Sequence, residues 1–175
     1  MPTSLKLHTA VLALSMSLFA APVLAAGGGS DSGGDAAQCK EGEVYDKDQK
    51  KCVQKSSAVD DDSLFETGRA YAYAGRYGEA IEVLGMVSDK NDPRVLNMLG
   101  FSHRKSGRID VGLGYYEEAL ALNPDFVLAR EYMGEAYLTL GDVGKAREQL
   151  SEIEKRCGKG CAEYAALEKQ IDQVN

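Results

Sequence analysis

The sequence contains little of what catalytic and metal-binding sites are built from. Its 175 residues include no tryptophan and two histidines, of which only His103 lies outside the N-terminal segment. One histidine without a paired nucleophile does not make a catalytic triad. No group of histidines, cysteines and carboxylates has metal-ligand spacing. The sequence therefore predicts no enzyme, no catalytic residues, no metal and no cofactor.

A long apolar run is also missing. The longest such segment, from Ala10 to Ala21, is shorter than the roughly 20 residues that span a bilayer. Lys6 precedes it and a small-x-small site ends at Ala25, which is the pattern of a secretory signal peptide. No cysteine follows that site, so a bacterial lipoprotein is not expected. We predict that residues 1–25 are a signal peptide and that the mature chain is soluble, exported and periplasmic, with no membrane insertion.

A basic surface is absent as well. The formal net charge is −7, from 27 acidic and 20 basic residues, and loss of Lys6 with the signal peptide makes it −8. Nucleic-acid binding and anionic lipid binding both depend on clustered positive charge. We therefore expect no nucleic acid among the partners.

The four cysteines form two local pairs in the sequence. Cys39 and Cys52 flank a short polar segment, and Cys157 and Cys161 form the motif C-G-K-G-C. An even number of cysteines suits an oxidising compartment, and four thiols allow three pairings. Local pairing is the simplest, because each pair closes its own turn. The CxxxC spacing differs from the CxxC of thiol oxidoreductases, but redox chemistry at Cys157 and Cys161 stays an alternative function.

The segment before the helices divides into two parts. Residues 26–38 are rich in glycine and serine and predict a flexible linker. Residues 39–53 predict a small disulfide-bonded unit, with a strand at Val44 and Tyr45 before a D-K-D-Q turn. We expect this two-stranded hairpin to lie outside the helical region, so that replacing both Cys39 and Cys52 leaves the helices intact.

The rest of the chain repeats a fixed spacing. A small residue at Gly68 recurs at Gly100 and Gly134, which are 32 and 34 residues apart. The middle unit carries the clearest version of the pattern: Leu99, Gly100, Gly107, Gly112, Tyr116, Ala119, Leu120 and Pro124. The upstream copy has Gly68, Tyr71, Gly75, Tyr77, Ala80 and Leu84. The downstream copy has Gly134, Tyr137, Gly141, Ala146, Leu150 and Ile153. Periodicity of this kind takes priority over other sequence signals.

A period near 34 with this helix-turn-helix pattern resembles the tetratricopeptide repeat (TPR) family. The resemblance implies an all-α solenoid of three repeats at about 61–92, 93–126 and 127–160, with a capping helix at 162–174, all within a TPR domain at 61–174. Individual helices are expected at about 61–74, 77–88, 93–106, 109–122, 126–140 and 143–156. Gly68, Gly100 and Gly134 should mark close helix crossings, with the small residues Ala80, Gly112 and Ala146 on the second helices. Leu84, Tyr116 and Leu150 should fill the gap between neighbouring repeats. His103 should pack, half-buried, where the family has tyrosine.

The family resemblance also implies a binding function, since TPR arrays are scaffolds. The first helix of each repeat lines a concave groove, which should bind a protein or peptide partner in the cell envelope. The expected groove residues are Phe65, Arg69, Tyr73, Asn97, Phe101, Arg104, Lys105, Glu131, Glu135 and Leu138. Phe101 should be an apolar anchor, while Arg104 and Lys105 attract an acidic or C-terminal group. The two-lysine, two-asparagine clamp of some TPR domains is not reproduced. A self-assembly module without a separate ligand is a further alternative.

Overall fold

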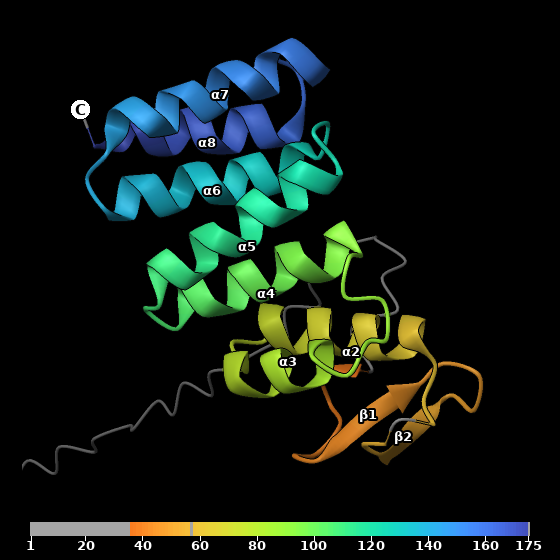
Figure 1. Cartoon of the computed structure of the whole chain (residues 1–175). Coiled ribbons are helices and arrows are strands. Elements are labelled where there is room, and N and C mark those ends of the chain that lie inside the picture. The colour runs from red at the N-terminus through yellow and green to blue at the C-terminus, as the bar shows by residue number, and fades with distance from the viewer. Residues whose placement is uncertain (1–35, 57, 175) are drawn as a thin grey trace, which may run out of the picture. The chain divides into compact units, whose positions relative to one another are not determined.

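The computed structural model describes residues 36–56 and 58–174, so the predicted signal peptide and most of the predicted linker lie outside the described residues. A short hairpin is followed by a series of helices (Figure 1). The elements are β1 (Glu43–Asp46), β2 (Lys51–Gln54), α2 (Asp61–Tyr73), α3 (Tyr77–Leu84), α4 (Pro93–Lys105), α5 (Ile109–Leu122), α6 (Val127–Thr139), α7 (Val143–Cys157) and α8 (Ala162–Gln173). The predicted fold class, three helix pairs and a C-terminal helix preceded by a disulfide-bonded hairpin, is confirmed.

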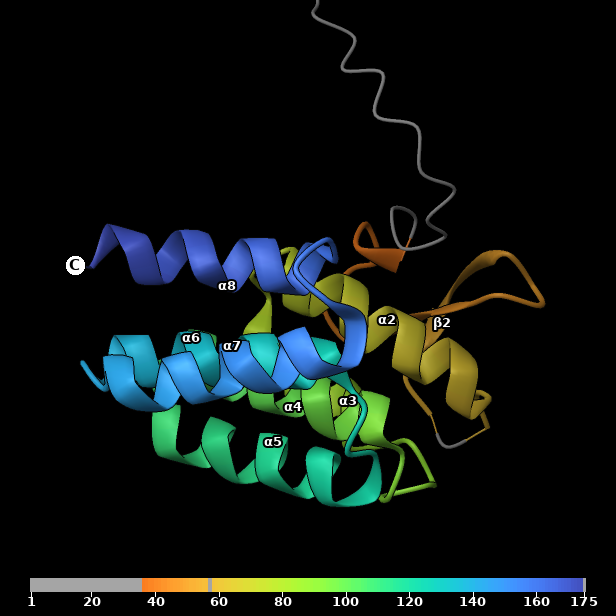
Figure 2. The same ribbon diagram turned by 90° about the horizontal axis from the view of Figure 1, so that it is seen from above.

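The helices stack in chain order. The helices within each pair, α2 with α3, α4 with α5 and α6 with α7, make the most extensive contacts, and each pair packs on the next. Figure 2 shows α5 and α8 on opposite sides of α6 and α7. The helices α2, α4 and α6 therefore share the inner side of the stack, and α8 continues this row through its contacts with α6.

Glycines set the distance between helices. A Cβ atom on Gly100 would lie 2.6 Å from Cε1 of Tyr116 and 3.0 Å from the carbonyl oxygen of Gly112. The backbones of α4 and α5 approach so closely that neither glycine has room for a side chain. Gly68 meets Leu84 in the same way. The three expected crossings are therefore close contacts.

The third crossing differs in its partner. A Cβ atom on Gly134 would lie 2.5 Å from Cδ2 of Leu167, which comes from α8. The side chain beside this glycine comes from α8, which folds back over α6 and inserts Leu167. Leu150 is only partly buried, whereas Leu167 is fully buried.

Helix α3 ends four residues earlier than expected, at Leu84 instead of Ser88. Gly85 follows as its C-cap, and glycine is a weak helix former. The ammonium group of Lys90 donates to the carbonyl oxygens of Gly85 (2.5 Å) and Val87 (2.7 Å). These bonds satisfy acceptors that the shortened helix leaves open.

The hairpin packs directly on α2. Val44 is fully buried and belongs to the same apolar core as the helices. The backbone NH of Tyr45 donates to Oγ1 of Thr67 (3.0 Å), and the hydroxyl of Tyr71 donates to the carbonyl oxygen of Glu43 (2.6 Å). The expectation of a unit outside the array is therefore wrong. In the described part of the chain the hairpin, and not another helix pair, precedes α2 and packs on it.

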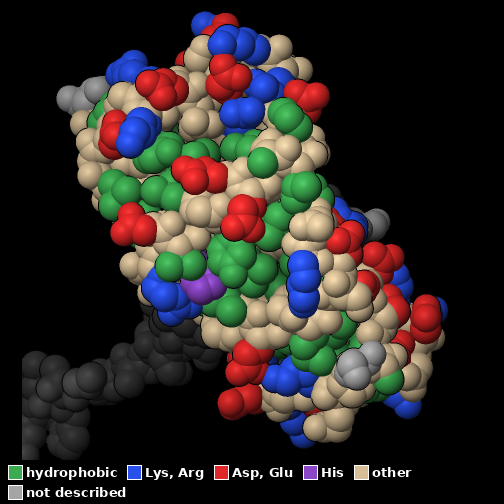
Figure 3. Space-filling view, in the orientation of Figure 1, with side chains coloured by type: hydrophobic (Ala, Val, Ile, Leu, Met, Phe, Trp, Pro, Cys, Tyr) green, Lys and Arg blue, Asp and Glu red, His purple; other side chains and the backbone are tan. Residues whose placement is uncertain are grey.

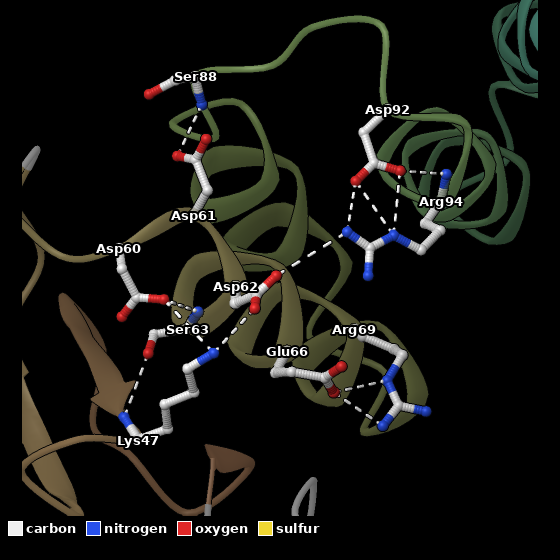
Figure 4. Close-up of polar contacts among 10 residues, drawn as sticks. All are labelled: Lys47, Asp60, Asp61, Asp62, Ser63, Glu66, Arg69, Ser88, Asp92 and Arg94. Carbon is white, nitrogen blue, oxygen red and sulfur yellow. Dashed lines mark hydrogen bonds and ion pairs between the residues drawn. The ribbon is translucent and has the colours of Figure 1, made fainter.

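Charged residues reinforce this end of the stack (Figure 4). Lys47 of the hairpin pairs with Asp62 of α2 at 2.9 Å. Arg94 of α4 lies 3.9 Å from Asp62 and 2.6 Å from Asp92, the N-cap of α4. Asp60 is the N-cap of α2 and accepts a bond from the backbone NH of Ser63. The pairs are largely exposed, so each contributes little to stability, but together they connect the hairpin, α2 and α4.

No helix in the described part of the chain is both long enough and apolar enough to cross a membrane.

Candidate binding groove

The inner side of the stack contains two hollows. The first, which we call the Asn97 hollow, has a volume of about 330 Å³ and lies along α2 and at the N-terminal ends of α4 and α6. It is lined by Phe65, Glu66, Arg69, Tyr73, Arg94, Asn97, Met98, Phe126 and Leu128. The second, the Lys105 hollow, has a volume of about 530 Å³ and lies at the C-terminal ends of α4, α6 and α8. It is lined by Arg104, Lys105, Glu135, Leu138, Thr139, Gln170, Gln173 and Val174.

Aromatic rings fill the centre of the groove. The ring of Phe101 lies 5.6 Å from that of Tyr73 and 5.0 Å from that of Tyr132. The hydroxyls of Tyr73 and Tyr132 lie 3.3 Å apart, so side chains from α2 and α6 meet across α4. Phe101 is only 8% exposed, whereas Tyr73 is 52% exposed. Phe101 is thus part of the core, and Tyr73 is the accessible aromatic residue. Sequence reasoning missed Tyr132.

The predicted role of Arg104 is wrong. This residue is 7% exposed, and its guanidinium group pairs with Glu135 of α6 at 2.5 Å. It also donates to the hydroxyl of Tyr116 (3.3 Å), and burial raises the pKa of Tyr116 to about 12. Gln170 of α8 donates to the other oxygen of Glu135 (2.5 Å). Arg104 and Glu135 therefore join α4, α6 and α8, and Arg104 is not free to bind a partner's carboxylate.

Lys105 remains an accessible cation. It is exposed at the end of α4, with its ammonium nitrogen 5.7 Å from the ring centre of Phe101. Leu138 lies across the Lys105 hollow and is partly buried. These two residues lie where the sequence placed them, at the surface of the groove.

The opposite end of the groove pairs aromatic rings with arginines. The guanidinium carbon of Arg94 lies 4.8 Å from the ring centre of Phe65, and that of Arg69 lies 6.0 Å from the ring centre of Tyr73. Arg69 also pairs with Glu66 at 2.8 Å. Contacts of this kind attract a cation to the ring face. Phe65 and Arg69 line the groove as predicted, and sequence reasoning missed Arg94, Phe126 and Leu128 beside them.

Two polar side chains of the groove are buried. Asn97 is 1% exposed, and its side-chain oxygen has no hydrogen-bond partner within the described residues. Glu131 is 9% exposed. Burial, followed by the charges of Glu135 and Glu163, raises the pKa of Glu131 to about 7. Both residues were predicted to line the groove, but not to be buried acceptors.

His103 lies outside the groove. It is half-buried, and its ring stacks on that of Tyr115 at 5.3 Å. Arg108 donates to its Nδ1 atom (2.9 Å). Burial and the charge of Arg108 lower the pKa of His103, so it is neutral at pH 7. These contacts give it a packing role between α4 and α5.

The outer face of the stack is a different kind of surface. Figure 3 shows this face, where hydrophobic side chains lie among acidic ones over α5 and α7. Val111 and Leu122 of α5 are exposed hydrophobic residues. At one end of this region, Cys157 and Cys161 form a disulfide at the corner between α7 and α8.

Part of the helical region matches a known protein family. Residues 97–160 match the model of the tetratricopeptide repeat family. The uncharacterized protein ycf37 of Pyropia yezoensis is 32% identical over 57 residues, which are 33% of this chain and 32% of that protein. The match thus spans about a third of the length of this curated relative.

Solved structures share the fold. The first TPR domain of Spaghetti (RPAP3), bound to an HSP90 peptide, has a TM-score of 0.58 at 22% identity, covering 68% of this chain and 94% of that one. The type III secretion chaperone SycD of Yersinia enterocolitica, in complex with a peptide of the translocator YopD, has a TM-score of 0.56 at 17% identity, covering 69% and 91%. The described helices therefore form a helical-repeat solenoid. Its residues 97–160 are similar to tetratricopeptide repeats.

Proposed function

We propose that this chain is an exported scaffold that binds a protein or peptide partner in the cell envelope through its inner groove. The observation that carries the proposal is the pair of hollows on the inner side of α2, α4, α6 and α8, with the exposed Tyr73 lining the Asn97 hollow. Two solved TPR structures with the same fold hold peptides, those of Spaghetti and SycD. Aromatic residues beside arginines are typical of binding hot spots.

Two features of the chain support export to the periplasm. The N-terminal segment has the charge and apolar pattern of a signal peptide ending at Ala25. All four cysteines are paired, as Cys39–Cys52 and Cys157–Cys161, and disulfides persist in oxidising compartments. N-terminal sequencing of the protein from a periplasmic fraction should begin at Ala26.

Site-specific crosslinking tests the groove. A photoreactive phenylalanine analogue at Tyr73 should crosslink a partner in envelope extracts, and one at Lys105 should crosslink the same partner. The matched control places the analogue at Leu122, the last residue of α5, which is similarly exposed but lines neither hollow. Crosslinks from Leu122 alone would place the binding surface outside the two hollows and overturn the proposal.

A redox function is the second candidate, favoured by one observation. Cys157 is exposed, so its disulfide with Cys161 is open to other thiols. After mild reduction, rapid alkylation of Cys157 at neutral pH would indicate the reactive thiolate that such a function requires. Slow alkylation, at the rate of an ordinary thiol, would leave the bond with a structural role.

A further inference from the structure

The groove contains one buried hydrogen-bond acceptor without a partner among the described residues, and a buried carboxyl group beside it in the repeat pattern. Buried polar groups in folded proteins are almost always paired, and an unpaired one calls for an explanation. The side-chain oxygen of Asn97 is buried without a partner among the described residues, and Asn97 lines the groove. The carboxyl group of Glu131 is also largely buried, and no cation forms an ion pair with it in the described part of the chain.

The two acceptors occupy equivalent positions in adjacent repeats. Asn97 and Glu131 are 34 residues apart, the same step that separates Gly100 from Gly134. Leu128 lines the Asn97 hollow and Glu135 lines the Lys105 hollow. Glu131 lies three residues after the first and four before the second, so it shares their face of α6. It therefore lies between the two hollows.

The charges around Glu131 leave this part of the groove negative. Glu135 on the same helix and Glu163 on α8 both raise the pKa of Glu131, and Arg104 of α4, which lowers it, is already paired with Glu135. The raised pKa of Glu131 reflects this imbalance together with burial. A second cation would offset this negative charge.

We propose that the groove recognises a basic side chain, lysine or arginine, of its protein partner, with the Asn97 oxygen and the Glu131 carboxylate as acceptors. This refinement rests on the proposed function. The aliphatic stem of such a side chain fits the apolar residues Met98, Phe126 and Leu128 of the Asn97 hollow. Such a basic side chain has the opposite charge to the acidic or C-terminal group expected from Arg104 and Lys105.

Three matched tripeptide probes test the charge preference: acetyl-Leu-Lys-Leu-amide, its norleucine analogue and its glutamate analogue. Binding is followed by NMR through the side-chain amide of Asn97 and the carboxyl carbon of Glu131. The lysine probe should bind about tenfold more tightly than the norleucine probe and should lower the pKa of Glu131, because a bound cation favours the ionised carboxyl. Its affinity should rise between pH 5.5 and 8.5 as Glu131 ionises.

Variants separate this site from general attraction to an acidic protein. Glu131→Gln should remove the tenfold preference for lysine over norleucine and make the lysine-probe affinity independent of pH. The control Glu117→Gln, at an exposed acid on α5, should change neither. Equal binding of the lysine and norleucine probes, preference for the glutamate probe, an unchanged preference in Glu131→Gln, or no shift at Asn97 and Glu131 would each overturn the inference. Crosslinking from Tyr73 is read separately, so a partner caught there without any lysine preference leaves the proposed function intact.

Discussion

The two ends of the repeat stack are closed by different devices. At the N-terminal end, the β1–β2 hairpin covers α2 through Val44 and through bonds to Thr67 and Tyr71. At the C-terminal end, α8 covers α6 and α7 with the buried side chains of Leu167 and Ile171. The first cover is a hairpin that its own disulfide closes and that combines one buried valine with hydrogen bonds to α2, whereas the second is a helix held by buried apolar side chains. A helical repeat cannot bury its own apolar face, so each end needs a cover, but the chemistry of the cover is free to differ.

The largest effect should follow from weakening the C-terminal cover. Leu167→Ala removes a fully buried side chain that packs on Gly134, and such changes cost about 3–4 kcal/mol of unfolding free energy. Urea unfolding should show this loss, and amide exchange in α8 should accelerate. The control Leu140→Ala, at an exposed position, should shift stability by less than about 0.5 kcal/mol. Equal losses in the two variants would contradict the role of α8.

The next effect should follow from opening the N-terminal cover. The Cys39–Cys52 bond spans 13 residues. Removing a cross-link that closes a loop of this length lowers the free energy of unfolding by about 3 kcal/mol in the chain-entropy model. The double variant Cys39→Ser, Cys52→Ser should lose that amount in urea unfolding and expose the amides of α2 to exchange. Helices α6 to α8 should keep their protection. If α2 stays protected, the hairpin does not depend on its disulfide to cover that helix.

A smaller effect is expected at the corner before α8. The Cys157–Cys161 bond spans four residues, which gives about 2 kcal/mol in the same chain-entropy model. The double variant Cys157→Ser, Cys161→Ser should lose less stability in urea than the Cys39, Cys52 pair, since Leu167 and Ile171 still hold α8 in place. A larger loss than for the first pair would mean that α8 is held by its disulfide and not by its apolar side chains.

The repeat spacing was enough to predict the helix pairs and their close crossings. Gly68 and Gly100 contact Leu84 and Tyr116, each 16 residues further along the chain, because each contact forms within one helix pair. Gly134 differs, because its partner Leu167 comes from α8 and not from α7, the second helix of its own pair. The docking of the hairpin was missed for a related reason. The Tyr45–Thr67 and Tyr71–Glu43 bonds involve backbone groups and carry no periodic signal.

The groove residues show what a helical projection can and cannot give. The projection placed Arg104 and Glu135 on the groove side, but not their pairing with each other, because these residues are 31 positions apart on different helices. It also gave no measure of burial for Asn97 or Glu131. A usable signal was present in the sequence: the equivalent positions of the three repeats hold Phe65, Asn97 and Glu131, which change from apolar to amide to acid along the stack.

This gradient predicts that the C-terminal end of the stack loses stability as the pH rises towards neutrality. The pKa of Glu131 is about 7 in the folded chain, above the value of about 4.3 for an unfolded glutamate. Between these values the folded state binds more protons, so stability is highest below the unfolded pKa and falls as pH rises through 7. Phe65, at the equivalent position of the first repeat, has no ionisable group.

Glu131→Gln should remove this dependence. Because the carboxyl keeps some access to solvent, we expect the variant to gain on the order of 1–2 kcal/mol over the parent at pH 8, and little at pH 4. Urea unfolding at pH 4, 6 and 8 measures the gain, and faster amide exchange in α8 than in α2 at pH 8 in the parent locates it. Glu117→Gln, at an exposed position on α5, should follow the parent at every pH. If Glu131→Gln and the parent lose stability in parallel as the pH rises, the carboxyl of Glu131 is not the group whose ionisation weakens the C-terminal end.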